Sequence, residues 1–94
     1  MEKEEIDKDT VFIGKKPIMS YVLAILTHIN SGNNNVFIKA RGMSISKAVD
    51  VSQLVIRKFS RELKVFNVEI GTEEIKDQDN KTKNVSYISI ELRR

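Results

Sequence analysis

The chain has 94 residues, 40% of them hydrophobic, which suffices for one domain with a modest core. It contains no cysteine, which excludes a disulfide framework and a thiolate zinc site. The longest apolar run, near residues 22–26, is far too short to span a bilayer, so we expect no membrane association. Because the N-terminus is charged rather than apolar, we expect no signal peptide.

The net charge of +3 is unevenly distributed along the chain. Residues 1–10 hold five acidic and two basic groups, whereas residues 11–94 hold fourteen basic and eight acidic groups. This pattern predicts a disordered acidic tail over residues 1–9 and a basic domain over residues 10–94. The alternative is a tail that competes with a polyanion for the basic face of the domain.

The first half of the chain predicts a strand, a helix and a second strand. Residues 10–13 form a short apolar run that Gly14 ends, and Pro17 suits the first position of a helix because its missing N–H costs nothing there. Apolar residues then recur at the spacing of one helical face until Gly32 and three asparagines end the helix. Residues 36–38 predict the second strand.

The second half predicts a helix and two late strands. After Gly42, either Ser44 or Ser46 can cap the helix. Residues 66–70 and 88–92 alternate with period two, and the polar residues 76–84 between them indicate the tip of a hairpin. The predicted inner face of this second helix consists of Ile45, Ala48, Val49, Ser52, Val55, Ile56 and Phe59.

The resulting order, β-α-β-α-β-β, predicts a two-layer α+β fold. Two helical crossovers imply parallel neighbours early in the sheet, and the final hairpin implies an antiparallel pair. We therefore expect a mixed four-stranded sheet with both helices on one face and a long C-terminal β-hairpin.

Basic residues cluster at the ends of the two early strands. Residues 11–49 contain no Asp or Glu. Basic side chains beside glycines suit a polyanion, because glycine lets the backbone approach closely. The five basic residues of this segment are Lys15, Lys16, Lys39, Arg41 and Lys47.

Each cluster also has an ordinary explanation. Lys15 and Lys16 are either a solvated loop pair or a phosphate contact at a helix N-terminus. Alternation places Lys39 and Arg41 on the same side of their strand, and Gly42 would offer a free N–H nearby. Lys47 lies in the first turn of the second helix, where a cation opposes the dipole, so another partner is expected unless it is an indifferent surface residue.

The hairpin tip carries Lys81 and Lys83. It is either an ordinary polar turn, with Asp77 and Asp79 diluting its charge, or an arm that reaches into the minor groove of a duplex. His28 has no cysteine or nearby carboxylate in the sequence with which to form a metal or catalytic site. We therefore predict no enzyme activity, no catalytic residues, no metal and no cofactor.

Several segments together resemble the Alba family of archaeal chromatin proteins. The resemblance lies in residues 11–22, which include GKKP at 14–17, in residues 38–42, IKARG, and in residues 45–50, ISKAVD. A looser match continues through residues 68–72 and 85–90, in the family's order. Each piece alone would be weak, but the combination is specific and spans nearly all of the chain after the tail.

The resemblance implies a dimer, homomeric or formed with a paralogue, that binds double-stranded DNA and RNA with little sequence preference. It implies phosphate contacts by Lys15 and Lys16, with Lys15 as the acetylation candidate. Arg41 and Lys47 match other basic residues of the binding face, and the two hairpins would extend as arms. Phe59 matches an aromatic position that supports contacts between dimers along DNA.

The resemblance, together with the basic clusters, implies a cytoplasmic, chromosome-associated protein that coats and compacts DNA. The predicted nucleic-acid-binding residues share either a positive charge or a close-approaching backbone. The runner-up prediction is an RNA-directed role, in RNA stabilisation or in an RNA-processing particle. A structural interaction domain with incidental basic residues is the third alternative. The predicted binding set is Lys15, Lys16, Lys39, Arg41, Gly42, Lys47, Lys81 and Lys83.

Overall fold

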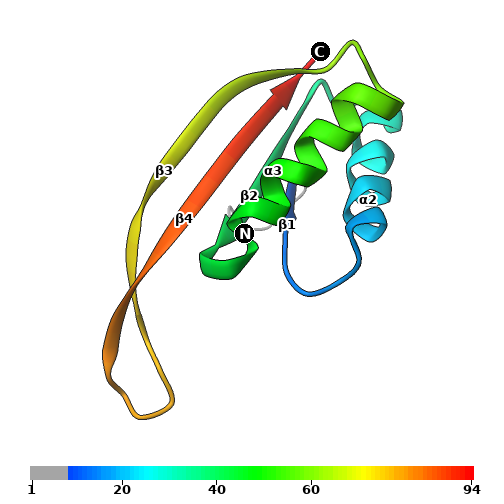
Figure 1. The fold of residues 1–94 in the computed structure, drawn as a ribbon. Helices are drawn as coiled ribbons and strands as arrows, with labels where there is room; N and C mark the ends of the chain where they lie inside the picture. The colour runs from blue at the N-terminus through cyan, green and yellow to red at the C-terminus, as the bar shows by residue number, and fades with distance from the viewer. Residues whose placement is uncertain (1–8) are drawn as a thin grey trace.

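The computed structural model describes residues 9–94 (Figure 1). The expected acidic tail, apart from Asp9, lies outside these residues. The strands and helices are β1 (Thr10–Phe12), α2 (Ile18–Asn30), β2 (Asn35–Arg41), α3 (Ile45–Leu54), β3 (Lys64–Lys76) and β4 (Thr82–Arg93). A 3₁₀ turn, η1 (Gly42–Ser44), precedes α3, and a π-helical turn, η2 (Val55–Phe59), follows it.

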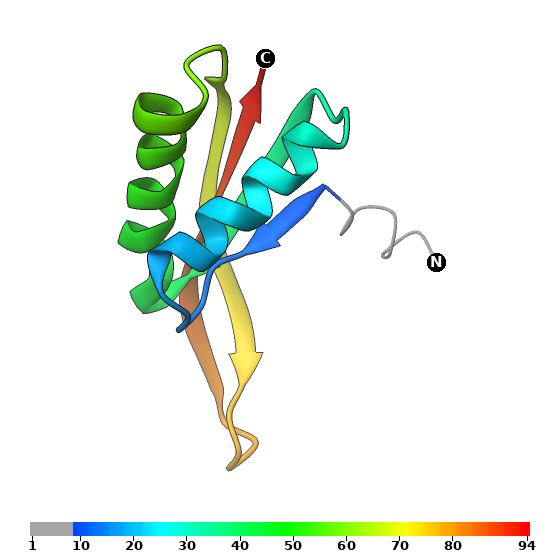
Figure 2. The same cartoon turned by 90° about the vertical axis from the view of Figure 1, so that its right-hand side faces the viewer.

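The four strands form one sheet in the order β1-β2-β4-β3. β1 and β2 are parallel, while β4 runs antiparallel to both β2 and β3. Both helices pack on one side of the sheet, which leaves an uncovered side that we call the open face (Figures 1 and 2). The predicted α+β fold with a mixed sheet and a C-terminal hairpin is confirmed.

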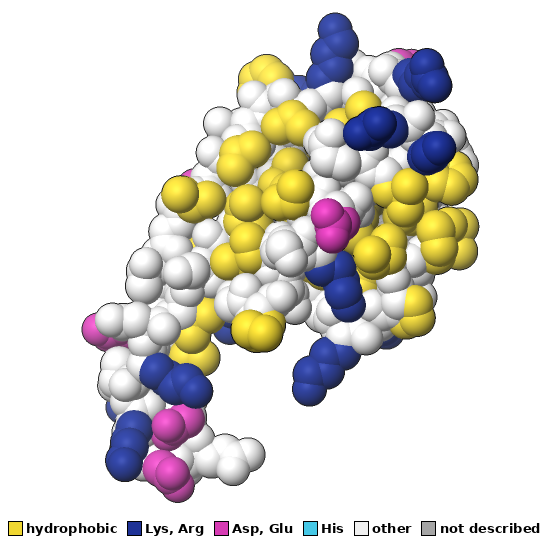
Figure 3. All heavy atoms as spheres, in the orientation of Figure 1, with side chains coloured by type: hydrophobic (Ala, Val, Ile, Leu, Met, Phe, Trp, Pro, Cys, Tyr) yellow, Lys and Arg dark blue, Asp and Glu magenta, His cyan; other side chains and the backbone are white. Residues whose placement is uncertain are grey.

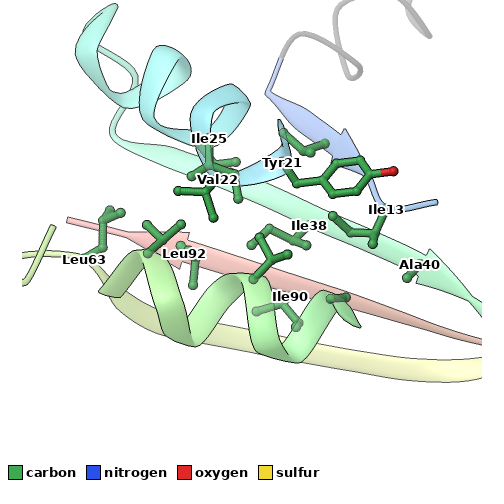
Figure 4. Close-up of a cluster of buried hydrophobic side chains, with 14 of the residues drawn as sticks. Ile13, Tyr21, Val22, Ile25, Ile38, Ala40, Leu63, Ile90 and Leu92 are labelled. Atoms are coloured by element: carbon green, nitrogen blue, oxygen red, sulfur yellow. The ribbon is translucent and has the colours of Figure 1, made fainter. Parts of the chain in front are cut away.

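The core lies between the helices and the sheet (Figure 4). Strand alternation directs Ile38 and Ile90 toward the helices, where they belong to the same buried cluster as Val22 and Ile25 of α2. Leu63, in the loop before β3, is also fully buried. Removing such an aliphatic side chain from water stabilises the fold by about 1.5–3 kcal/mol, so this layer fixes the sheet relative to both helices.

The second helix differs from its predicted phase. Val51 is buried, whereas Val49 and Phe59, both expected on the inner face, are exposed. In η2 the backbone N–H of Ser60 donates to the carbonyl of Val55, five residues earlier, and this wide turn rotates Phe59 away from the core. Serine capping is also absent here: Ser44 occupies the N-cap position but makes no side-chain cap hydrogen bond.

β2 is longer than the predicted strand over residues 36–38, because it is paired on both sides. Its partner β1 covers three positions and β4 covers seven. The β3–β4 pairing is regular except at Phe66, where the register shifts between Val65 and Asn67. Within residues 9–94, neither helix is both long and apolar enough to cross a membrane.

Candidate nucleic-acid interface

The turn between β1 and α2, residues 14–17, carries the first pair of lysines, and we call it the lysine loop. The hydroxyl of Tyr21, one turn into α2, accepts hydrogen bonds from the backbone N–H groups of Gly14, at 2.8 Å, and Lys16, at 2.9 Å. The Tyr21 side chain itself is buried in the core. These two hydrogen bonds therefore hold the loop backbone against the hydrophobic core.

Lys47 fastens the same loop from α3. Its Nζ donates to the carbonyl oxygens of Gly14, at 2.9 Å, and Lys16, at 3.0 Å. It also lies 5.9 Å from the centre of the Tyr21 ring, within the range of a cation–π contact. These carbonyls are partners that offset the unfavourable position of a cation in the first turn of a helix.

The side chains of Lys15 and Lys16 are exposed. Within residues 9–94 the two ion pairs use arginines, so no carboxylate of this range neutralises either lysine. The loop leads directly into the N-terminus of α2, where unpaired backbone N–H groups and the helix dipole favour anions. A rigid loop with two exposed cations at a helix N-terminus can hold phosphate groups.

Lys39 and Arg41 lie on the open face, as alternation predicts, since Ile38 and Ala40 between and beside them are buried. Lys39 is half-buried, whereas the Arg41 side chain is 59% exposed. Arg41 Nε lies 2.9 Å from Glu73 Oε1 of β3, an ion pair that the sequence analysis did not anticipate.

Gly42 ends β2 in a left-handed conformation. Its φ of +53° is one that side-chain-bearing residues adopt rarely, so glycine permits the sharp passage from β2 into η1. The residue is exposed and follows Arg41 directly. Gly42 therefore sets the path of the chain beside the basic strand end.

The hairpin extends well beyond the helices, and we call its distal part, residues 72–86, the arm (Figure 1). At its tip, Asp77 Oδ1 accepts hydrogen bonds from the backbone N–H groups of Asp79 and Lys81, both at 2.9 Å. Asn80 takes a positive φ of 64° in the same turn. Asp77 thus builds the turn, while the exposed Lys81 and Lys83 provide its positive charge.

A further basic group lies at the C-terminal end of α3, far from the lysine loop (Figures 1 and 3). Arg57, Lys58 and Arg61 line a shallow hollow there together with Ile56. Phe59, in the same turn, is 49% exposed. The structure therefore places Phe59 on the surface beside basic residues.

The structure brings some of the predicted residues together and separates others. Lys15, Lys16 and Lys47 meet at one loop, and Lys39 and Arg41 share the open face, whereas Lys81 and Lys83 lie out on the arm. Sequence reasoning missed Tyr21 and Glu73, and it treated Asp77 only as a charge on the hairpin tip rather than as the acceptor that builds the turn. Tyr21 carried a usable signal, because a buried tyrosine hydroxyl needs a hydrogen-bond partner.

Comparison with known proteins places this surface in context. The family model described as Alba matches residues 9–72. DNA/RNA-binding protein Alba 1 of Archaeoglobus fulgidus is 49% identical over 85 residues, which cover 90% of this chain and 94% of that protein. DNA/RNA-binding protein Alba of Methanococcus maripaludis is 46% identical over 83 residues, or 87% of this chain and 93% of that protein.

Two solved structures share the fold. Alba from Thermoplasma volcanium matches with a TM-score of 0.86 and 44% identity, covering 90% of this chain and 99% of that chain. ALBA1 from Trypanosoma brucei matches with a TM-score of 0.72 and 16% identity, covering 93% of this chain and 69% of that chain. At that lower identity the likeness concerns the fold alone.

Proposed function

Because the chain belongs to the Alba family, we propose that it binds double-stranded DNA without sequence preference and that it also binds RNA. The observation that carries this proposal is the lysine loop. Tyr21 and Lys47 hold its backbone, while Lys15 and Lys16 are left exposed at a helix N-terminus. The similar proteins are named for nucleic-acid binding, and the chain is accordingly a binding protein rather than an enzyme.

Binding would rest on phosphates rather than on base edges. Contacts from lysine and arginine to phosphates position a protein on a duplex and carry no direct sequence information. The contact with the duplex would extend from the lysine loop along β2, through Lys39 and Arg41, to the backbone near Gly42. Lys81 and Lys83 on the arm would add contacts farther along the duplex. In the cell, we propose a cytoplasmic, chromosome-associated role in which phosphate-driven binding coats and compacts DNA. Acetylation of Lys15 would weaken this binding because it removes a positive charge.

RNA is the second candidate ligand. The names of the most similar curated proteins given above include RNA as well as DNA. A-form duplexes are recognised mostly through shape, phosphates and 2′-hydroxyls, which the same cationic surface can contact. An RNA-stabilising role, or a place in an RNA-processing particle, would follow if RNA is the preferred ligand.

We propose that the binding unit is a dimer. Val65, Val68 and Ile70 of β3 pair with buried β4 residues and so share the helix-covered face of the sheet, yet they stay exposed because α3 does not reach over them. Together with Val49 of α3 they form an apolar surface between β3 and α3 (Figure 3). A second copy of the chain would cover this surface and place two lysine loops on one body.

A salt titration of duplex binding tests the function. If a dimer neutralises roughly six phosphates, the logarithm of affinity should fall against the logarithm of salt concentration with a slope of about −5. Filter binding with DNA and RNA duplexes of unrelated sequence would give this slope and the ligand preference together. A flat salt response, or strong preference for one sequence, would contradict phosphate-driven binding.

Light scattering at micromolar concentration tests the proposed dimer separately, and a molar mass equal to that of one chain would refute it.

A further inference from the structure

The open face contains a hollow that shares Lys39 and Arg41 with the duplex-binding proposal but whose aromatic and acidic lining that proposal does not use. Its volume is about 580 Å³, within the range of small-ligand sites, and its lining comes from all four strands. Phe12 of β1 pairs with Lys39 of β2, which pairs with Ser89 of β4, which in turn pairs with Glu69 of β3. These four residues therefore form one row across the floor of the hollow.

One aromatic side chain, Phe12, lies in this row, and a second, Tyr87, borders it. Phe12 is 59% exposed, although its neighbours Val11 and Ile13 are buried on the other face. Tyr87 packs against β3 at Gly71: a Cβ built on Gly71 would lie 2.6 Å from the Tyr87 hydroxyl oxygen and 2.7 Å from Cζ. Only glycine at position 71 lets the Tyr87 ring lie against the sheet. The hollow therefore has an apolar aromatic surface open to solvent, which a flat ring can cover.

The charged groups of the hollow are arranged for a ligand that is both anionic and a hydrogen-bond donor. Lys39 lies in the row beside Phe12, where its ammonium can meet a phosphate. Glu69, at the far end of the row, offers only acceptors, which suit the amino and imino N–H groups of a nucleobase. The Arg41–Glu73 pair lines the hollow too.

We propose that the open face binds an unpaired nucleotide of a single-stranded nucleic acid, with the base stacked on Phe12 and its phosphate at Lys39. Bases in a duplex are stacked on one another and cannot enter a hollow in a sheet, whereas unpaired bases stack on exposed aromatic side chains of such sheets. Phe12 lies two residues before Gly14, so a nucleic-acid strand bound at Phe12 can continue onto the lysine loop. The site thus adds single-strand recognition to the proposed duplex binding.

A stacking contact can be separated from charge by substituting Phe12 alone. The probes are a fluorescein-labelled single strand of about 12 nucleotides without self-complementarity, made as RNA and as DNA, and a duplex of the same length. For Phe12→Ala we expect about tenfold weaker single-strand binding, the scale of one lost base–aromatic stack, and unchanged duplex binding. Phe12→Trp should retain single-strand affinity because it keeps a ring.

Phe66 provides the matched control. It is 57% exposed, almost as much as Phe12, but it lies outside the hollow, and the Arg93 guanidinium covers its ring at 3.5 Å from the centroid. Phe66→Ala should leave single-strand affinity unchanged. Ultraviolet crosslinking of the single strand should mark Phe12 or Tyr87 rather than Phe66.

Three outcomes for Phe12→Ala would overturn the site. They are an unchanged single-strand affinity, an equal loss of affinity for the duplex, and a molar mass by light scattering that differs from that of the wild type. The last would show that a second copy of the chain covers this face. Failure of the wild-type protein to bind the duplex would instead refute the proposed function and leave the single-strand result to stand alone.

Discussion

At the scale of single residues, Lys15 and Lys16 should contribute affinity without contributing stability. Both side chains are exposed, and exposed surface substitutions usually change stability by no more than about 0.5 kcal/mol. Changing both to alanine should weaken duplex binding strongly and reduce the salt slope by about 2 for each subunit, or about 1 for each lost phosphate contact. Filter binding at several salt concentrations, with thermal melting as the control for folding, measures both. Unchanged affinity would move the binding face elsewhere.

Lys47 should behave differently from the two lysines that it supports. Lys47→Met keeps a similar length but removes two charge-assisted hydrogen bonds to the loop carbonyls, each worth about 1.5–3 kcal/mol in a protected site and less where solvent reaches it. We expect a lower melting temperature and weaker duplex binding with nearly the same salt slope. Lys47→Arg, which retains the charge, is the comparison. A slope reduced as much as by loss of Lys15 would show that Lys47 contacts phosphate itself.

At the scale of elements, the pairing of β2 with β4 carries an acid-sensitive contact. Glu91 Oε2 accepts hydrogen bonds from Arg93 Nε, at 2.7 Å, and Asn35 Nδ2, at 3.1 Å, and its side chain is buried. The hydrogen bond from Arg93 lowers the pKa of Glu91 below its ordinary value, and Asn35 acts in the same direction, while burial opposes them.

The lowered pKa of Glu91 fixes the sign of its pH dependence. Its contribution to stability is present above the unfolded pKa of about 4.3 and is lost as pH falls through the lower folded value. Glu91→Gln should therefore be less stable than the wild type near neutral pH, and the difference should shrink below about pH 4. Thermal melting of both proteins across this range tests the prediction. A difference independent of pH would show that the carboxylate charge is not involved.

Elements were predictable from sequence where local pattern decides them. Period-two alternation placed Lys39 and Arg41 opposite Ile38 and Ala40, and that arrangement is present. The exposure of Phe59 was not predictable in the same way, since the π-helical turn η2, which follows α3, adds a residue that the regular helical period does not contain.

The lysine loop shows the same limit within the candidate site. Its two exposed lysines could be named from the sequence, but the bonds from Lys47 span 33 and 31 residues along the chain. Contacts of that range depend on how α3 packs beside α2. The sequence pattern identifies Lys47 only as a cation in the first turn of a helix, where it opposes the helix dipole.

At the scale of the whole molecule, Phe59 is the residue expected to matter for assembly. A buried phenylalanine truncated to alanine costs about 3–5 kcal/mol, but Phe59 is 49% exposed and should cost far less. We expect Phe59→Ala to melt near the wild-type temperature and to coat long duplexes less cooperatively. Melting curves and binding isotherms on long and short duplexes decide this. A large fall in melting temperature with unchanged cooperativity would assign Phe59 to the fold of one subunit.

The ion pair between Arg41 and Glu73 joins the body to the base of the arm, and it makes Glu73 an internal counterion. An exposed pair of this kind is weak, so a phosphate can displace the carboxylate at little cost. If a duplex binds here as proposed, we expect the displaced Glu73 carboxylate to face the phosphates and to repel them. The Arg41–Glu73 junction would then add almost no net positive charge to the binding surface. We therefore expect a bound duplex to dissociate at a lower salt concentration than a count of the surface cations implies.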